Sequence, residues 1–232
     1  MEQIYMIPVN EAFDECKKEN VFECPFCKMY ETLEKKELDY ALGPAMMEPN
    51  TRIAMNDKGF CLTHFEKMAK MGNRLSLALI LESHLGELKG KLEGNFFEKL
   101  FGGAAKTHIK LAKYQNSNCF VCERIEYHFT RMLDTTLYLY KTDKAFKPKV
   151  AGQRYFCLPH YAEFIELAKN QLEKDKFKEL FGLMELIEKE YFEKICKDVS
   201  WFCKKFDYRY KDEPWGDSKE AIEHSIALLA GK

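Results

Sequence analysis

The sequence contains little proline and glycine, with 7 Pro and 12 Gly among 232 residues. This low content excludes a collagen-like or low-complexity chain. Net charge is almost absent as well, because 36 Lys and Arg stand against 37 Asp and Glu, which leaves a formal charge of -1. No overall positive field would draw the chain onto a phosphate backbone, so nucleic-acid binding is disfavoured.

Long apolar runs are also missing. Nowhere do about 18 uncharged apolar residues follow one another, so we expect no membrane span. The first residues, Met1 to Pro8, include neither a basic leader nor an apolar stretch of signal-peptide length. We therefore expect a cytoplasmic protein that does not bind a membrane.

No stretch shows the alternation of apolar and polar residues that is typical of strands, so the predicted fold class is all-α. Two segments show helical spacing most clearly. The stripe Leu180, Met184, Ile187, Tyr191, Ile195, Val199, Phe202 and Phe206 and the seam Ala78, Leu81, Leu85, Leu88 and Leu92 are predicted to face the core. Capping and breaking signals predict helices over about 11–18, 25–42, 61–71, 73–92, 119–140, 157–170, 177–206 and 218–230. Loops are predicted over 46–58, with room for one helical turn from Thr51, and over 143–154.

Cysteine is abundant, with nine residues. Cys119 follows Cys24 by 95 positions, and Cys157 follows Cys61 by 96. The spacing indicates one unit written twice, in which a Cys-x-x-Cys pair precedes a Cys-x-x-His pair. The four pairs are Cys24-Pro-Phe-Cys27, Cys61-Leu-Thr-His64, Cys119-Phe-Val-Cys122 and Cys157-Leu-Pro-His160.

Three Cys and one His form a complete tetrahedral ligand set for zinc. We therefore predict two zinc ions per chain, one in each copy of the unit. The first site would consist of Cys24, Cys27, Cys61 and His64, and the second of Cys119, Cys122, Cys157 and His160.

Other chemistry is compatible with these ligands. Three Cys and one His can also hold an iron–sulfur cluster, and a helix-opening Cys-Pro-Phe-Cys resembles a redox-active dithiol, although the βαβ context of thioredoxin is missing. Buried thiols without a metal are the remaining interpretation. Four protein ligands leave no position for water or substrate, so we assign no catalytic residue.

The remaining candidates have plainer interpretations. Three further cysteines lack a partner at ligand spacing and are expected to pack in the core, and four histidines without such a partner are expected at the surface or as satisfied buried groups. Four aromatic residues could line a pocket between the halves but are typical of core. One basic loop is typical of a solvated segment, although it could contact an acidic partner or RNA. These are Cys16, Cys196 and Cys203; His84, His108, His128 and His224; Tyr138, Tyr140, Trp201 and Trp215; and the loop from Lys141 to Arg154.

Repetition and helix breakers divide the chain into four parts. We expect a first metal-binding repeat over 1–93, a junction over 94–104, a second repeat over 105–176 and a C-terminal helical segment over 177–232 that packs on the repeats. The repeats should be unequal, because the second copy lacks about four turns of helix after its histidine.

Part of the chain resembles a known family. Cys-Pro-Phe-Cys27, Leu38-Asp39-Tyr40, Gly59-Phe-Cys-Leu-Thr-His64 and the run from Gly72 to Leu79 are similar to an uncharacterised family of bacterial cytosolic proteins, a domain of unknown function. The resemblance rests mainly on the first 90 residues and implies a bacterial, anaerobe-type source and a metal-site fold. It implies no activity.

The sequence favours a protein- or small-ligand-binding or regulatory module, built on a zinc scaffold. A redox or metal sensor that acts through the Cys-x-x-Cys pairs is the second hypothesis. An iron–sulfur electron carrier or enzyme is the third. The partner and the ligand are not identified by the residues.

Overall fold

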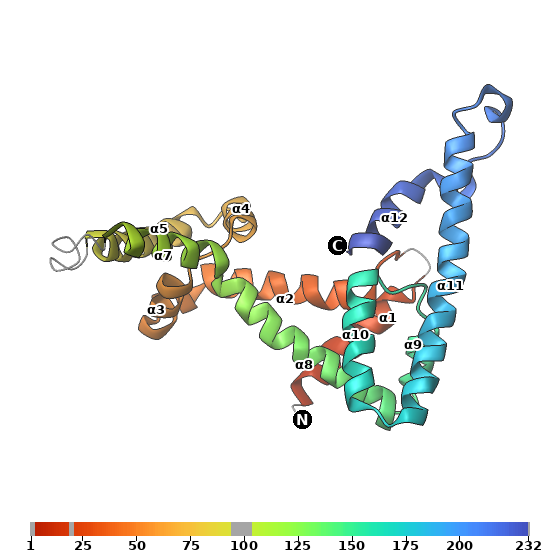
Figure 1. Ribbon diagram of the computed structural model, residues 1–232, viewed down its shortest axis with the longest axis horizontal. Coiled ribbons are helices and arrows are strands. Elements are labelled where there is room, and N and C mark those ends of the chain that lie inside the picture. Colours follow the sequence, from red (N-terminus) through yellow and green to blue (C-terminus); the bar gives the residue numbers. More distant parts are fainter. Residues whose placement is uncertain (1–2, 19–20, 94–103, 232) are drawn as a thin grey trace. The chain divides into compact units, whose positions relative to one another are not determined.

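The described residues of the computed structural model, 3–18, 21–93 and 104–231, form helices and contain no strand, which confirms the all-α class within these ranges (Figure 1). In this part of the chain, eleven α-helices are joined by turns and short 3-10 segments. They are α1 (Met6–Cys16), α2 (Pro25–Leu42), α3 (Pro49–Lys58), α4 (Leu62–Lys70), α5 (Arg74–Glu93), α7 (Ala104–Ser117), α8 (Phe120–Thr142), α9 (Lys147–Ala151), α10 (Leu158–Gln171), α11 (Lys174–Lys204) and α12 (Ala221–Ala230). The 3-10 segments are η1 (Gln3–Tyr5), η2 (Pro44–Met47), η3 (Tyr208–Tyr210) and η4 (Gly216–Glu220).

Most predicted helices are present, but two predicted loops contain helices. Pro49 opens α3 within the stretch taken as a loop, since a proline fits the first turn of a helix, where its missing N–H is not needed. Pro148 lies in the first turn of the short α9 for the same reason. Helix α1 begins at Met6 rather than near Glu11, with Pro8 again in its first turn.

The described chain forms two compact units. Unit 1 consists of residues 1–31 and 129–232, and unit 2 consists of residues 32–128. Helices α2 and α8 each begin in one unit and end in the other. The repeats predicted from internal duplication stay a prediction, and the junction over 94–104 lies outside the described residues except for its last position.

Unit 1 has an aromatic core. The ring of Phe13 lies 5.9 Å from Phe26 and 4.9 Å from Phe146, and Phe26 lies 5.4 Å from Phe156 and 4.9 Å from Phe164. All five rings are buried. Because Phe26 lies between Cys24 and Cys27, burial of this ring also fixes the position of the first Cys-x-x-Cys pair.

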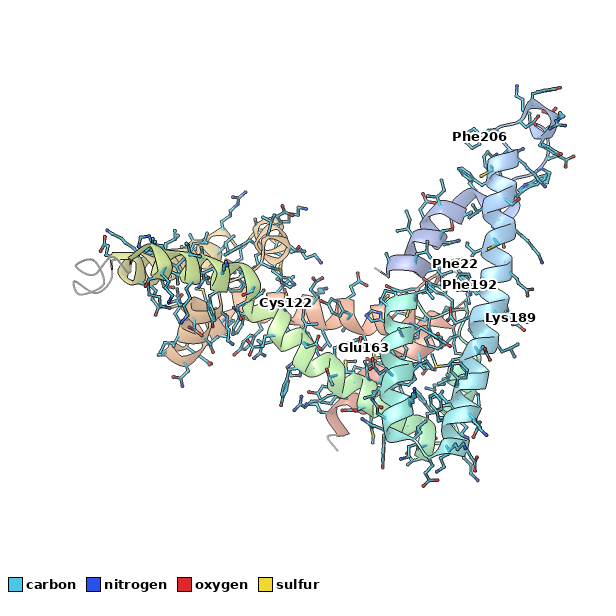
Figure 2. The ribbon with its side chains drawn as sticks, viewed as in Figure 1. Phe22, Cys122, Glu163, Lys189, Phe192 and Phe206 are labelled. Atoms are coloured by element: carbon cyan, nitrogen blue, oxygen red, sulfur yellow. The ribbon has the colours of Figure 1, made fainter. Side chains whose placement is uncertain are left out.

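Helices α10, α11 and α12 pack against one another in unit 1 (Figure 1). The predicted stripe of α11 is buried from Leu180 to Ile195. Beyond Ile195, Val199 and Phe202 are half-buried, and the prediction is wrong only for Phe206, which lies just past the end of the helix and is 76% exposed. Figure 2 labels Phe206.

In unit 2, the buried face of α5 differs from the predicted seam. Leu85 and Ala78 are exposed, whereas Leu77, Ile80 and His84 are buried. Helix α3 packs on this buried face. Polar contacts join the two helices: Nδ1 of His84 lies 2.9 Å from the carbonyl oxygen of Asn56, and the Asn56 side chain accepts a 2.9 Å hydrogen bond from Ser83.

Within the described ranges, none of the helices combines the length and the apolar character needed to cross a bilayer.

Candidate metal centres

Two groups of four side chains lie together, and each could hold a metal ion. Their composition corrects the predicted assignment. The unit 1 site joins the first Cys-x-x-Cys pair to the second Cys-x-x-His pair, and the unit 2 site joins the first Cys-x-x-His pair to the second Cys-x-x-Cys pair. The unit 1 site is Cys24, Cys27, Cys157 and His160; the unit 2 site is Cys61, His64, Cys119 and Cys122.

Helix length explains why the pairs cross between the halves. Cys24 and Cys27 lie at the start of α2, whose 18 residues span about 27 Å at 1.5 Å per residue. Cys119 and Cys122 lie at the start of α8, whose 23 residues span about 35 Å. Each helix carries the chain into the other unit before its own Cys-x-x-His pair is reached, so each pair meets ligands from the other half.

All four pairs lie at helix N-termini, as predicted. In each pair the first cysteine is the N-cap, because its carbonyl oxygen accepts the first helical hydrogen bond, over 2.8 to 3.1 Å. The second ligand is then at the third helical position, where N-cap and N3 side chains face each other. In α8 the backbone N–H of Cys122 points at the sulfur of Cys119, with N and Sγ 3.5 Å apart. A Cys-x-x-Cys or Cys-x-x-His pair is thus a capping arrangement whose two side chains converge.

The unit 1 site is tightly gathered. Nδ1 of His160 lies 3.1 Å from Sγ of Cys157 and 3.4 Å from Sγ of Cys27, and the two sulfurs are 3.5 Å apart. Burial raises the pKa of the Cys24 thiol, and the neighbouring Cys157 and Cys27 add to the rise.

Apolar groups and the end of the chain enclose the unit 1 site. Its three cysteines are at most 3% exposed. The ring of His160 lies 5.1 Å from that of Phe129. Gly231 ends α12 with a φ of 75°, and a β-carbon at this position would lie 3.4 Å from Sγ of Cys157 and 3.5 Å from Sγ of Cys27. The C-terminal helix therefore covers these ligands.

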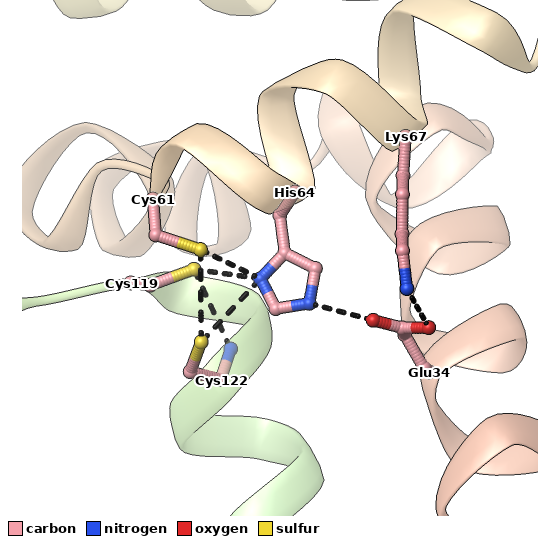
Figure 3. A network of polar contacts seen from close by, with 6 residues as sticks. All are labelled: Glu34, Cys61, His64, Lys67, Cys119 and Cys122. Carbon is pink, nitrogen blue, oxygen red and sulfur yellow. Dashed lines mark hydrogen bonds and ion pairs between the residues drawn. The ribbon is translucent and has the colours of Figure 1, made fainter. Parts of the chain in front are cut away.

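The unit 2 site is built in the same way (Figure 3). Nδ1 of His64 lies 3.2 Å from Sγ of Cys61, 3.2 Å from Sγ of Cys119 and 3.4 Å from Sγ of Cys122. The sulfurs of Cys61 and Cys122 are 3.9 Å apart. The backbone N–H of Phe120 donates a 2.9 Å hydrogen bond to the carbonyl oxygen of Gly59, which ties together the segments that carry these ligands.

A carboxylate orients the histidine of the unit 2 site. Oε1 of Glu34 lies 3.2 Å from Nε2 of His64, and Oε2 accepts a 2.5 Å hydrogen bond from Nζ of Lys67 (Figure 3). Burial lowers the pKa of His64, against the opposing influence of Glu34. A carboxylate on the outer nitrogen of a metal-binding histidine holds the ring with its inner nitrogen toward the ion.

The two sites differ in their access to solvent. Cys122 is exposed and Cys61 is half-buried, although His64 and Cys119 are buried. In the unit 1 site only His160 is more than slightly accessible. Reagents in solution should reach the unit 2 sulfurs first.

The distances fit one tetrahedral ion at each site. Zn–S bonds of about 2.3 Å and Zn–N bonds of about 2.0 Å place the ligand atoms of a tetrahedron about 3.5 to 3.8 Å apart. The separations given above range from 3.1 to 3.9 Å, and all ligand atoms of a site lie within 4.8 Å of one another. Burial raises the pKa of Cys122 to about 12, and Cys119 and Cys61 contribute. Thiols packed together in this way resist ionisation until a cation offsets the charge, so the donor set suits a metal that binds thiolates.

The other cysteines and histidines take no part in these groups. None of the nine cysteines, all of which lie in the described ranges, is in a disulfide bond. Cys16 is buried as predicted, but Cys196 and Cys203 are exposed rather than packed in the core. The four remaining histidines contact other groups: His84 contacts Asn56, His108 the carbonyl oxygen of Leu92, His128 Glu37, and His224 the ring of Phe22.

The aromatic candidates and the basic loop all lie in unit 1. Tyr138, Tyr140, Trp201 and Trp215 all belong to this unit. Tyr140 is buried as expected of core, Tyr138 and Trp201 are half-buried, and Trp215 is exposed, which corrects the prediction for that residue. In the loop, Lys149 donates to Asp14 over 2.6 Å, and Lys147 donates to Glu179 over 2.6 Å.

Sequence reasoning missed two groups that shape the sites. Glu34 belongs to a charged run that is typical of a solvated helix face, and its contact with His64 depends on how α2 and α4 pack. Gly231 follows α12, and a terminal glycine alone gives no sign of what it covers. Neither residue carries a spacing signal that links it to the metal ligands.

Comparison with family models identifies the chain as a member of DUF6062, a family of unknown function whose model matches residues 1–232. No curated protein and no solved structure matches the chain.

Proposed function

We propose that this DUF6062 protein is a helical binding module whose two units are each held together by a structural zinc ion. The observation that supports the proposal is the presence of two Cys3His groups whose ligand atoms all lie within 4.8 Å of one another. A structural zinc site can contribute on the order of 10 kcal/mol to folding. Each ion would join segments far apart in the chain, such as Cys24 and Cys157.

Zinc suits these donors better than the alternatives. Mixed thiolate and imidazole ligands in a tetrahedron are typical of zinc. Sulfurs 3.5 Å and 3.9 Å apart fit ligands that share one ion, whereas an iron–sulfur cluster has several irons and holds its cysteines farther apart. Thiols stay available as zinc ligands where the compartment keeps them reduced, which agrees with the predicted cytoplasmic location.

Binding rather than metal catalysis follows from the ligand number. Four protein ligands complete the zinc coordination and leave no position for water, which catalytic zinc requires. The ions would therefore fix the helices, and a surface or cavity of the scaffold would meet the ligand or the protein partner.

Elemental analysis of protein purified without added metal tests the proposal. We expect two zinc ions per chain and a colourless solution. A brown protein with iron and acid-labile sulfide would support the iron–sulfur alternative instead. Protein that is folded and contains no metal would rule out both interpretations.

A second candidate function, a redox or metal sensor, is favoured by one observation. Cys122 of the unit 2 site is exposed, and a thiolate that solvent reaches is the kind that peroxide oxidises. Mild peroxide should then release one zinc ion per chain and unfold part of unit 2. If both ions stay bound under these conditions, the redox-sensor function is excluded.

A further inference from the structure

A cavity of about 390 Å³ opens in unit 1, outside the metal site. Its wall combines an apolar part with a rim that carries charges of both signs. Phe22, which is labelled in Figure 2, and Ile187 contribute to the apolar part. The charged lining residues are Arg154, Lys194, Glu190 and Asp217.

Two residues of the cavity wall have a buried polar atom without a hydrogen-bond partner. Among the described residues there are three such side-chain atoms: Oε1 of Gln153, Oε2 of Glu188 and the hydroxyl oxygen of Tyr191. Gln153 and Tyr191 line the cavity, and Glu188 precedes Tyr191 by one helical turn on α11. A buried polar group without a partner is costly, so two in the wall of one cavity need an explanation.

Other contacts of the same side chains hold the unpartnered atoms in place. The Gln153 side-chain nitrogen donates to the carbonyl oxygens of Phe13 and Lys149, over 2.9 and 2.8 Å, which fixes the amide and leaves Oε1 as an acceptor. The Tyr191 ring stacks on Tyr155 with 4.5 Å between centroids. A ligand with a hydrogen-bond donor would supply what these groups lack.

The charges narrow the class of ligand. The rim carries two cationic and two anionic residues, and Lys194 contacts Asp217 of the rim at 3.0 Å and Asp198, outside the lining, at 2.7 Å. A ligand with a single charge could pair with the rim residues of only one sign. A zwitterion brings an ammonium group for Glu190 and the acceptor oxygens and a carboxylate for the cations, while an apolar side chain can contact Phe22 and Ile187.

We propose that this cavity binds a free amino acid with an apolar side chain. The inference deepens the proposed function, because it assigns a ligand class to the binding module. Two contacts join the cavity wall to the unit 1 site: Oε1 of Glu188 accepts a 2.6 Å hydrogen bond from the backbone N–H of Phe156, which precedes Cys157, and Tyr191 stacks on Tyr155. Occupancy of the cavity should therefore also stiffen the segment that carries Cys157.

Calorimetric titration of the purified full chain with L-leucine and L-phenylalanine tests the proposal. N-acetyl-L-leucine lacks the ammonium group and L-leucinamide lacks the carboxylate, so both should bind at least about tenfold more weakly, the effect of losing one buried charged interaction. Zinc content is measured on the same samples. If neither amino acid binds at millimolar concentration while zinc is present, the cavity proposal is wrong and the zinc scaffold stands.

Two variants connect binding to the cavity. Tyr191→Phe removes a hydroxyl that has no partner in the protein, so it should leave the thermal stability equal or higher while weakening L-leucine binding about tenfold. Glu190→Gln should weaken binding similarly, whereas Glu193→Gln, an exposed change on the same helix, should not. The assignment would be overturned if all three variants bound L-leucine as tightly as the wild type does. It would also be overturned if L-leucinamide bound as tightly as L-leucine. A chain that lacks zinc altogether would instead contradict the proposed function.

Discussion

At the level of single residues, Glu34 is the main difference between the surroundings of the two metal-site histidines. Its carboxylate contacts Nε2 of His64 on one side and Nζ of Lys67 on the other. His160 is surrounded differently, by the rings of Phe26, Tyr30 and Phe129. The same ligand set is thus oriented by charge in unit 2 and by packing in unit 1.

Replacing this carboxylate should weaken one site only. Removal of a group that orients a metal-binding histidine lowers metal affinity about 10- to 100-fold. For Glu34→Gln we expect one of the two zinc ions to be lost to a chromogenic chelator at correspondingly lower chelator concentration. Glu31→Gln changes an exposed residue one turn earlier on α2 and should leave both affinities unaltered. Equal weakening by the two variants would show that Glu34 does not act through His64.

Glu188 makes stability depend on pH in a defined direction. Burial raises its pKa from 4.5 to about 7, although the N–H of Phe156 counteracts the rise. The folded state therefore keeps a proton that the unfolded chain has already lost, and the free energy of unfolding falls as pH rises from about 4.5 through about 7. The loss is at most about 3 kcal/mol, because each pKa unit corresponds to 1.36 kcal/mol.

Denaturant unfolding at a series of pH values measures this effect. Glu188→Gln carries no ionisable group at this position and can still accept from the N–H of Phe156. The difference in stability between wild type and the variant should change with pH between about 4.5 and 7 and level off outside this window. A constant difference across the range would contradict the raised pKa.

At the level of helices, the crossed ligand sets give a test by metal counting. The double variant Cys24→Ser with Cys157→Ser removes two ligands from one site, so we expect one zinc ion to remain. Cys24→Ser with Cys61→Ser affects both sites, so we expect none. If each repeat instead held its own ion, as the sequence alone suggested, the two variants would give the opposite result. Cys16→Ser serves as a control, since Cys16 belongs to neither site.

Helix starts and ligand identity could be predicted from the sequence, because both are local. The cysteines that cap α2, α4, α8 and α10 lie beside residues that favour a first helical turn, such as Pro25 and Pro159. The partners of each pair could not be predicted. They depend on where the 18-residue α2 and the 23-residue α8 end in space. The spacing of 34 residues between the first Cys-x-x-Cys pair and the Cys-x-x-His pair that follows it does not contain this information.

The α5 seam shows a similar limit. The apolar period predicted a helix over about 73–92, and α5 spans Arg74–Glu93, but the period does not determine which face is buried. Here the face is set by α3, whose Arg52 donates a 2.9 Å hydrogen bond to Ser83 and whose Asn56 contacts His84. A polar interface between helices is not visible as hydrophobic periodicity.

At the level of the whole molecule, the two sites should exchange metal at different rates. The unit 2 site includes the exposed Cys122, whereas the ligand cysteines of the unit 1 site are at most 3% exposed and lie against Gly231. Excess chelator should release zinc in two phases of equal amplitude, followed by absorbance of the chelator complex. Glu34→Gln should accelerate the fast phase and leave the slow phase unaltered. A single phase would mean that burial does not control release.

The crossed ligand sets also determine the order in which the two sites can be completed during synthesis. Positions 61 to 122 lie within the stretch from 24 to 160, so the unit 2 ligands are nested between those of unit 1. A chain that emerges from the ribosome N-terminus first can complete the inner set as soon as Cys122 is exposed, and loop closure is entropically easier over this shorter span. Cys24 and Cys27, although made first, must wait for His160. A nascent chain arrested between these points would carry one ion and an unligated dithiol near its N-terminus.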